Sequence, residues 1–175
     1  MNLLIIRHAI AEDKERFAAT GRHDDQRPLT EAGRDKMRRA AEGLRTVSPR
    51  VAVLASSPLV RARETAEIVA PAVSVARVEI VDALRPDRDV KELLDWLRER
   101  IAPNEKNDDE RTVAVVGHEP HLGGLVTWLM CGKTESRIEL KKGAACLLHF
   151  DDTPSAGEAM LRWALTPSQL RSLGG

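Results

Sequence analysis

Three short apolar runs constrain the fold of this chain more than any other feature of its sequence. They cover residues 3–6, 51–55 and 112–116, and each is apolar at successive positions rather than at alternate ones. Such runs are typical of strands that are covered on both faces, as in the middle of a parallel sheet. A weaker run over residues 78–81 predicts a fourth strand.

Segments with helical spacing lie between these runs. Thr30 is suited to an N-cap, and apolar residues follow it at helical intervals. Pro120 and Gly132 are the start and stop signals of another helix. The alternation predicts a three-layer α/β/α sandwich with a mostly parallel central sheet and right-handed crossovers. The predicted helices cover residues 30–44, 61–70, 90–101 and 120–132.

The last part of the chain departs from this alternation. Residues 144–150 and 160–165 predict two strands joined by a polar turn, and we expect them to form a C-terminal antiparallel hairpin at the edge of the sheet. Residues 11–28 and 103–110 predict loops, because they lack apolar periodicity. The sequence shows neither an internal repeat nor a linker between domains, so we expect one domain over residues 1–175.

Composition limits the classes of partner. The 27 basic and 27 acidic residues leave a formal net charge of zero, whereas nucleic acid and anionic membranes require a basic surface. The first apolar run reaches Arg7 too soon for a signal peptide, and no run approaches the ~18 residues of a transmembrane helix. We therefore expect a cytoplasmic protein with neither nucleic-acid nor membrane partners. Cys131 and Cys146 are expected to be buried thiols in a reducing compartment.

Residues able to bind an anion follow each of the three strongest strands. Arg7 and His8 follow the first strand, Ser57 and Arg61 follow the second, and His118 follows the third. In open α/β sheets, ligands bind beyond the carboxyl ends of the strands. We therefore expect these five side chains to converge, and the coincidence is more informative than any one of the motifs.

Two arginines and two histidines at one place describe a phosphate site. Arginine pairs bidentately with phosphoryl oxygens and stays charged at any physiological pH. Histidine, with an ordinary pKa of about 6.5, presents either a neutral nitrogen as a nucleophile or a protonated one as a donor. Phosphoryl transfer needs mainly positioning and charge stabilisation, and a histidine nucleophile divides hydrolysis into two displacements.

At these residues the chain resembles the histidine phosphatase (phosphoglycerate-mutase-like) superfamily. The resemblance rests on Arg7-His8 after the first strand, on the SPLVRARET segment at 57–65 and on Gly117-His118. Within that superfamily, the RPLTEAG segment at 27–33 and the proline two residues after His118 are similar to the SixA branch of phosphohistidine phosphatases. The resemblance extends over residues 2–130 and, more loosely, over 165–167.

The resemblance implies a metal-independent phosphatase without a cofactor, in which the phosphoryl group passes to His8. Arg7, Arg61 and His118 would bind and neutralise this group. Arg27 would lie near the pocket, and Ser57 is a further candidate for phosphate binding. The implied substrate is phosphohistidine on a protein, such as a histidine phosphotransfer domain of a signalling relay.

The acid that would protonate the leaving group is not evident in the sequence. Superfamily mutases carry a carboxylic acid after the middle strand, where this chain reads DALRPD at 82–87. Asp82 and Asp87 are candidates there. Glu119 is another, although a glutamate in a first helical turn also suits the helix dipole. Phosphohistidine has a leaving group that can carry its own proton, so a missing acid favours this substrate.

Other interpretations stay open. Arg27 has Asp24 and Asp25 nearby for an ordinary ion pair, and Ser57 before a proline is typical of a turn. The HEPH segment at 118–121 invites a metal site, but no third zinc ligand is evident. The alternative functions are a phosphatase of small phosphate esters or other phosphoproteins, and a non-catalytic phosphate- or phosphopeptide-binding domain. A binding domain, however, needs no nucleophilic histidine.

Overall fold

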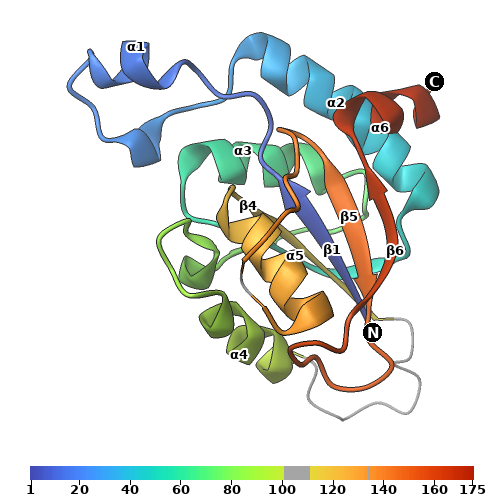
Figure 1. Cartoon of the computed structure of the whole chain (residues 1–175). Coiled ribbons are helices and arrows are strands. Elements are labelled where there is room, and N and C mark those ends of the chain that lie inside the picture. The colour runs from blue at the N-terminus through green and yellow to red at the C-terminus, as the bar shows by residue number, and fades with distance from the viewer. Residues whose placement is uncertain (101–110, 134) are drawn as a thin grey trace.

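The centre of the molecule is a six-stranded sheet, seen in a computed structural model that describes residues 1–100, 111–133 and 135–175 (Figure 1). The strand order is β3-β2-β4-β1-β5-β6. The first four strands in this order are parallel, and β5 is antiparallel to both β1 and β6. The predicted mostly parallel sheet with an antiparallel hairpin at its edge is therefore confirmed. The strands are β1 (Asn2–Arg7), β2 (Val51–Ser56), β3 (Val78–Ile80), β4 (Thr112–Gly117), β5 (Ala145–His149) and β6 (Met160–Leu165).

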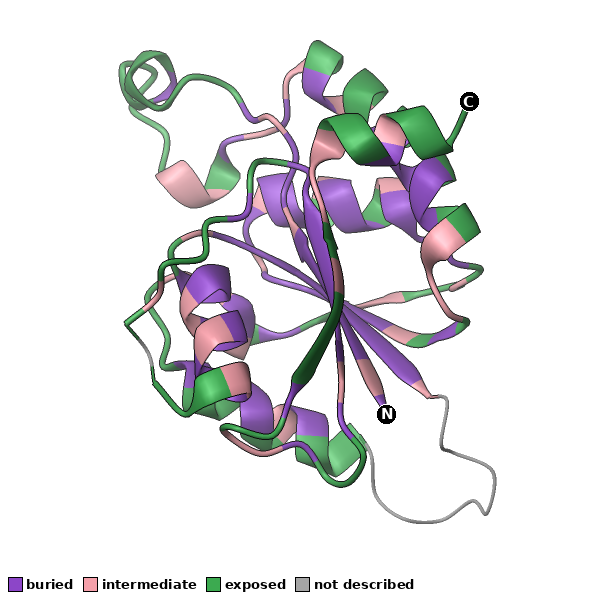
Figure 2. Cartoon of the chain, turned by 45° about the vertical axis from the view of Figure 1, so that its right-hand side comes forward, coloured by how far each residue is buried: buried purple, intermediate pink, exposed green. Residues whose placement is uncertain are grey.

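Two layers of helices cover the two faces of this sheet (Figures 1 and 2). Leu4 and Ile6 of β1 pack in the core beneath one layer, whereas Leu3 and Ile5 pack in the core beneath the other. Burial on both sides explains why this strand is apolar at successive positions. One layer contains α2 (Glu31–Val47), α3 (Val60–Val69) and α6 (Pro167–Leu173), and the other contains α4 (Val90–Arg100) and α5 (His121–Cys131).

Helix α2 begins where the sequence predicts, because Thr30 is its N-cap and accepts a hydrogen bond from the Gly33 N–H at 2.9 Å. Gly33 also allows the helix to lie directly against the chain after β1, since a Cβ there would overlap the carbonyl oxygen of Ile10. Gly43 does the same at the other end of the helix, against the carbonyl oxygen of Leu170 in α6. The two glycines fix α2 against both neighbours.

The segment predicted as a loop over residues 11–28 contains two short helices, so that prediction is wrong in part. They are α1 (Lys14–Ala18), which is capped by the Asp13 side chain, and the 3-10 helix η1 (Asp24–Gln26). Within α1 only Phe17 is buried, which explains why the sequence has no helical stripe there. An isolated bridge between Ala11 and Leu29 closes the base of the segment, which projects beside the sheet as the blue excursion in Figure 1.

Several smaller features differ from expectation or fall outside the described residues. Helix α6 is not predicted, and a second 3-10 helix, η2 (Asp82–Leu84), follows β3. Cys146 is buried but Cys131 is exposed, so the expectation of two buried thiols is wrong for Cys131. Ile101 and the predicted loop at 103–110 lie outside the described residues. Among the helices that the structure describes, none has the length and apolar character needed to cross a membrane.

Candidate active site

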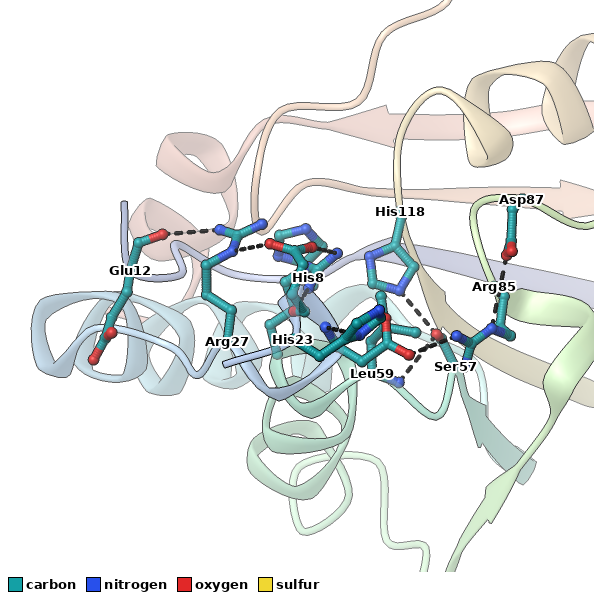
Figure 3. A network of polar contacts seen from close by, with 12 residues as sticks. His8, Glu12, His23, Arg27, Ser57, Leu59, Arg85, Asp87 and His118 are labelled. Carbon is teal, nitrogen blue, oxygen red and sulfur yellow. Dashed lines mark hydrogen bonds and ion pairs between the residues drawn. The ribbon is translucent and has the colours of Figure 1, made fainter. Parts of the chain in front are cut away.

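Four buried polar side chains gather at the carboxyl ends of β1, β2 and β4, and Figure 3 labels three of them, His8, Ser57 and His118. His8, Ser57 and His118 follow these strands directly, and Arg61 lies in the first turn of α3. Their exposed fractions are 6% for His8, 0% for Ser57, 5% for Arg61 and 2% for His118. The rings of His8 and His118 lie 5.0 Å apart between centroids, and are tilted by 52°. The structure thus places these residues together as the strand ends predict.

The imidazole of His8 is held in one tautomer. Its Nδ1 lies 2.7 Å from the carbonyl oxygen of Ala9, and because a carbonyl only accepts, Nδ1 carries the proton and donates. Burial lowers the pKa of His8 to about 3, against the opposing effect of the Ala9 hydrogen bond, and the charges of Arg61 and Arg7 lower it further. His8 is therefore neutral at physiological pH, with the lone pair on Nε2.

Thr65 fixes the backbone that orients His8. Its hydroxyl accepts a hydrogen bond from the Ala9 N–H at 3.0 Å and donates to the carbonyl oxygen of Arg61 at 2.7 Å. The same side chain thus joins the residue after the histidine to the first turn of α3. In the sequence Thr65 stands out only as the last residue of the 57–65 motif, which does not indicate this role.

His118 lies against Ser57, with its Nε2 2.9 Å from the serine Oγ. Its Nδ1 is buried and has no hydrogen-bond partner within the described part of the chain. Burial lowers the pKa of His118 to about 2, helped by the neighbouring His8 and Arg61. A bound anion would reverse part of this shift, because an opposite charge close by favours the imidazolium.

Asp24 joins two arginines of the site, Arg27 and Arg61. Its carboxylate accepts from Arg27 Nε at 2.8 Å and lies 3.2 Å from Arg61 Nη2, while its backbone carbonyl accepts from Arg61 Nη1 at 2.9 Å. The hydrogen bond from Arg27 lowers the pKa of Asp24, so it remains a carboxylate at neutral pH. Burial lowers the pKa of Arg61, and the charge of Asp24 opposes that shift.

Arg27 is both buried and ion-paired, so the alternative of an ordinary ion pair with Asp24 is observed (Figure 3). Arg27 shares the carboxylate of Asp24 with Arg61, which places it beside the site, and its charge contributes to the lowered pKa of His118. The second half of the 11–28 segment lies against the site through two aspartates. Asp24 contacts Arg61, and Asp25 accepts a hydrogen bond from Arg85 Nη2 at 2.5 Å. The sequence names Asp24 only as a partner of Arg27 and misses its contact with Arg61.

The chain that precedes β5 holds Arg7 in place. Its Nη1 donates to the carbonyl oxygen of Leu140 at 2.5 Å and lies 3.9 Å from the exposed carboxylate of Glu139. Its Nε is buried without a partner within the described residues. The Gly143 N–H also donates to the carbonyl oxygen of His8 at 3.1 Å. The loop before β5 is thus part of the site, although the order of the strand ends in the sequence does not indicate it.

None of the three candidate acids, Asp82, Asp87 and Glu119, contacts His8, Arg61 or His118 by a hydrogen bond or ion pair within the described residues. The carboxylate of Asp82 accepts a hydrogen bond from Arg88 Nη2 at 2.7 Å. Both carboxylate oxygens of Glu119 accept backbone N–H groups, from Gly123 at 3.1 Å and from Leu140 at 2.8 Å. Asp87 has a side chain that is 76% exposed and lies 3.7 Å from Arg85 Nε. Glu119 therefore connects α5 to the loop that holds Arg7.

The structure also tests the interpretation of residues 118–121 as part of a metal site. Among the described residues, no three histidine, cysteine, aspartate or glutamate side chains are grouped so that they could hold a metal ion. His121 lies next to the site with both ring nitrogens buried and unpartnered by any described residue, and burial lowers its pKa. The donors at the centre of the site are guanidinium, imidazole and hydroxyl groups, which suit an oxyanion.

Comparison with known proteins gives a consistent set of relatives. The family model of the histidine phosphatase superfamily (branch 1) matches residues 3–86. An uncharacterised protein of Picosynechococcus sp. is 34% identical over 143 residues, which are 81% of each chain. The phosphohistidine phosphatase SixA of Escherichia coli is 27% identical over 172 residues, 98% of this chain and 97% of that one. A solved structure of the protein histidine phosphatase SixA complexed with tungstate superposes with a TM-score of 0.78, at 27% identity over 97% of this chain and 99% of that chain.

Proposed function

The chain belongs to the histidine phosphatase superfamily, in its SixA-like branch, and from this premise we propose that it removes phosphate from phosphohistidine on proteins. The observation that carries the proposal is the hydrogen bond from His8 Nδ1 to the Ala9 carbonyl oxygen. It leaves a neutral Nε2 as the nucleophile, inside a buried group of arginine and histidine side chains. The domain extends over the whole chain, and the mechanism needs neither metal nor cofactor.

In the first displacement, the lone pair of His8 Nε2 forms a bond to phosphorus as the bond from phosphorus to the substrate imidazole breaks. The electron pair of that bond returns to the departing imidazole, whose other ring nitrogen already carries its own proton. In the second displacement, water attacks phosphorus and releases inorganic phosphate and His8. The proton of the water is taken up by the phosphate as the P–N bond breaks.

The arginines stabilise the charge of the phosphoryl group in both displacements. Arg7 belongs to β1 and Arg61 to α3, and each has an Nε without a partner within the described residues. Guanidinium groups fit the spread of charge over the equatorial phosphoryl oxygens. Ser57 and His118 add a hydroxyl and an imidazole beside the same group.

Among the described residues, none of the three candidate acids is bonded to His8, Arg61 or His118, and this supports phosphohistidine over an ordinary phosphate ester. An alkoxide leaving group needs a proton, whereas an imidazole leaves without one. Glu119 is held by two backbone N–H groups and Asp87 lies exposed beside Arg85. The E. coli relative carries the name phosphohistidine phosphatase, and the SixA structure holds tungstate, a tetrahedral oxyanion like phosphate. Both support the proposal.

We take the partner to be a phosphorylated protein of the cytoplasm, such as a histidine phosphotransfer domain. The test compares a phosphohistidine protein with an aryl phosphate, each with and without EDTA. We expect preferred hydrolysis of the phosphohistidine protein and no effect of EDTA. Activity lost with EDTA would contradict the metal-free mechanism, preference for the ester would favour a small-molecule phosphatase, and binding without turnover would favour a binding domain.

The covalent intermediate has its own test. Rapid quenching of the wild-type protein should trap a phosphate that is stable in base and labile in acid, as expected of a phosphoramidate. The His8→Ala variant should trap none and should lose turnover. A His8→Ala variant that keeps its turnover would rule out the covalent route.

A further inference from the structure

A pocket of about 180 Å³ lies next to the candidate active site, between α2, α6 and the chain that follows β1. Buried Met37 and Ala40 give it an apolar floor. Three cationic side chains line the same pocket, which we call the cationic pocket: Lys36, Lys142 and Arg171. Lys36 and Lys142 are exposed, so their charged ends reach solvent.

The cationic pocket adjoins the nucleophile. Ala9, whose carbonyl oxygen orients His8, lines the pocket, and so does Gly143, whose N–H donates to the carbonyl oxygen of His8. The charge of Lys142 is close enough to contribute to the lowered pKa of His8. In the sheet, β5 and β4 flank β1 on opposite sides. The pocket therefore extends the site toward β5, away from Ser57 and His118.

The charges of this pocket are uncompensated. None of Lys36, Lys142 and Arg171 forms an ion pair with a carboxylate of the described residues, and no acidic residue lines the pocket. Arg27, Arg61 and Arg85 at the active site, by contrast, each have an aspartate partner. In a chain of zero formal net charge, three unpaired cations around one hollow form a local positive field that attracts an anion.

The size of the pocket indicates what kind of anion it takes. Its volume of about 180 Å³ is below the roughly 300–1,000 Å³ of sites that enclose a whole small molecule. The apolar floor suits the methylene groups of an acidic side chain, and the lysines suit its carboxylate. A substrate protein that presents a phosphorylated residue to His8 must also cover this neighbouring surface.

We propose that the cationic pocket binds an aspartate or glutamate side chain of the phosphorylated protein, close to the phosphohistidine, and so selects acidic substrate surfaces. This inference rests on the proposed function, since it assumes a protein substrate. It adds a specificity-determining site that lies outside the group of residues that handle the phosphoryl group.

The first test uses two phosphohistidine peptides that differ only in acidic residues near the phosphohistidine, replaced by their amides in the second peptide. We expect the wild-type protein to prefer the acidic peptide by about tenfold in kcat/KM, as expected for a few partly exposed charge pairs. In the Lys36→Ser/Arg171→Ser double variant the preference should fall toward one. Lys91→Ser, at an exposed lysine of α4, is the matched control and should keep the preference.

A second readout separates this inference from the proposed function. The unphosphorylated acidic peptide should inhibit hydrolysis of an aryl phosphate by the wild-type protein, and should inhibit the double variant about tenfold more weakly. This holds even if no phosphohistidine peptide is hydrolysed, a result that would contradict only the proposed function. Equal inhibition of both proteins, or no inhibition of the wild type, would overturn the inference.

Discussion

Asp24 contacts the guanidinium of Arg61 twice, through its carboxylate at 3.2 Å and through its backbone carbonyl at 2.9 Å. The second contact does not depend on the side chain. A phosphoryl group that approaches Arg61 therefore meets the negative charge of the Asp24 carboxylate. This carboxylate already lies against one of the guanidinium nitrogens that would bind the phosphoryl oxygens. Asp24 has two opposed effects, since it holds Arg61 in place and repels the substrate.

The Asp24→Asn variant should separate these effects. Removing the charge should lower the inhibition constant of inorganic phosphate about threefold to tenfold, because a carboxylate no longer repels the anion. Inhibition of aryl phosphate hydrolysis measures this directly. Asp35→Asn, on the exposed side of α2 where Asp35 pairs with Arg38, is the control and should leave the constant unchanged. Weaker phosphate binding in Asp24→Asn would instead show that holding Arg61 is the dominant effect.

Replacing Arg61 should reduce kcat/KM far more than it reduces stability. Arg61→Ala should lose about 3–4 kcal/mol of transition-state stabilisation, as is typical for a lost electrostatic donor. Arg61→Lys should recover little of this, because an ammonium group cannot form the bidentate fork. Kinetics and thermal unfolding on the same preparations measure both quantities. Arg63→Ala, at an exposed position of the same helix, should keep wild-type kinetics; an equal loss there would contradict a specific role for Arg61.

Stability should fall in acid because of the buried histidines. Burial lowers the pKa of His8 to about 3 and of His118 to about 2, from the usual 6.5. Below about pH 6.5 the unfolded imidazoles bind protons that the folded ones do not, so the free energy of unfolding decreases as pH falls. At about pH 5, His8 and His118 should each lower the free energy of unfolding by roughly 2 kcal/mol relative to neutral pH.

Urea unfolding at about pH 7.5 and about pH 5 measures this loss. The His118→Gln variant should show a smaller decrease between the two conditions than the wild type, since one buried imidazole is gone. His121, whose pKa burial also lowers, adds to the decrease in both proteins and cancels in the comparison. Parallel decreases would contradict the assignment of a neutral, buried His118.

Two glycines of α2 allow a test of how helix position affects the nucleophile. A Cβ at Gly33 overlaps the carbonyl oxygen of Ile10, and a Cβ at Gly43 overlaps that of Leu170. Both alanine variants should be destabilised by about 1–3 kcal/mol, as for overpacking elsewhere. Only Gly33→Ala should also lower kcat at temperatures where the protein is folded, because Ile10 is two residues from His8. Equal effects on kcat would show that stability alone controls activity.

Glu119→Gln tests whether this carboxylate acts as an acid. Because both its oxygens accept backbone N–H groups, the amide can replace only one of these contacts, and stability should fall modestly, by about 1 kcal/mol. The dependence of kcat on leaving-group pKa, measured over a series of aryl phosphates, should be unchanged. A steeper dependence in the variant would show that Glu119 donates a proton to the leaving group.

The sheet and the centre of the site are predictable from the sequence because both depend on strong local signals. Strands such as β1 and β4 are apolar on both faces, and parallel strands end at one edge, so His8 and His118 have to meet. Helix α6 also has a local signal, at its N-terminus. Thr166 and Gln169 form a capping box around Pro167, a pattern readable in the sequence.

The rest of the site depends on contacts between distant segments. Nothing local to Asp24 indicates that it reaches Arg61, 37 residues away, and nothing local to Leu140 indicates that its carbonyl oxygen meets Arg7. The same holds for Lys142, which lies in a loop and joins Lys36 and Arg171 only through the packing of α2 against α6. Loop residues with few apolar neighbours carry no periodicity from which their partners can be inferred.

The position of β1 between β4 and β5 has a consequence for how the protein is made. Its register places Leu3 beside Val113 and Leu148, so both neighbours of this strand are translated more than a hundred residues after it. During synthesis the strand that carries the nucleophile leaves the ribosome unpaired and apolar on both faces, a state that favours capture by chaperones. Because Gly143 and Ala144 bond to the backbone of Arg7 and His8, a nascent chain that stops before them cannot complete the active site. Activity should therefore arise only late, after the C-terminal hairpin has emerged and docked.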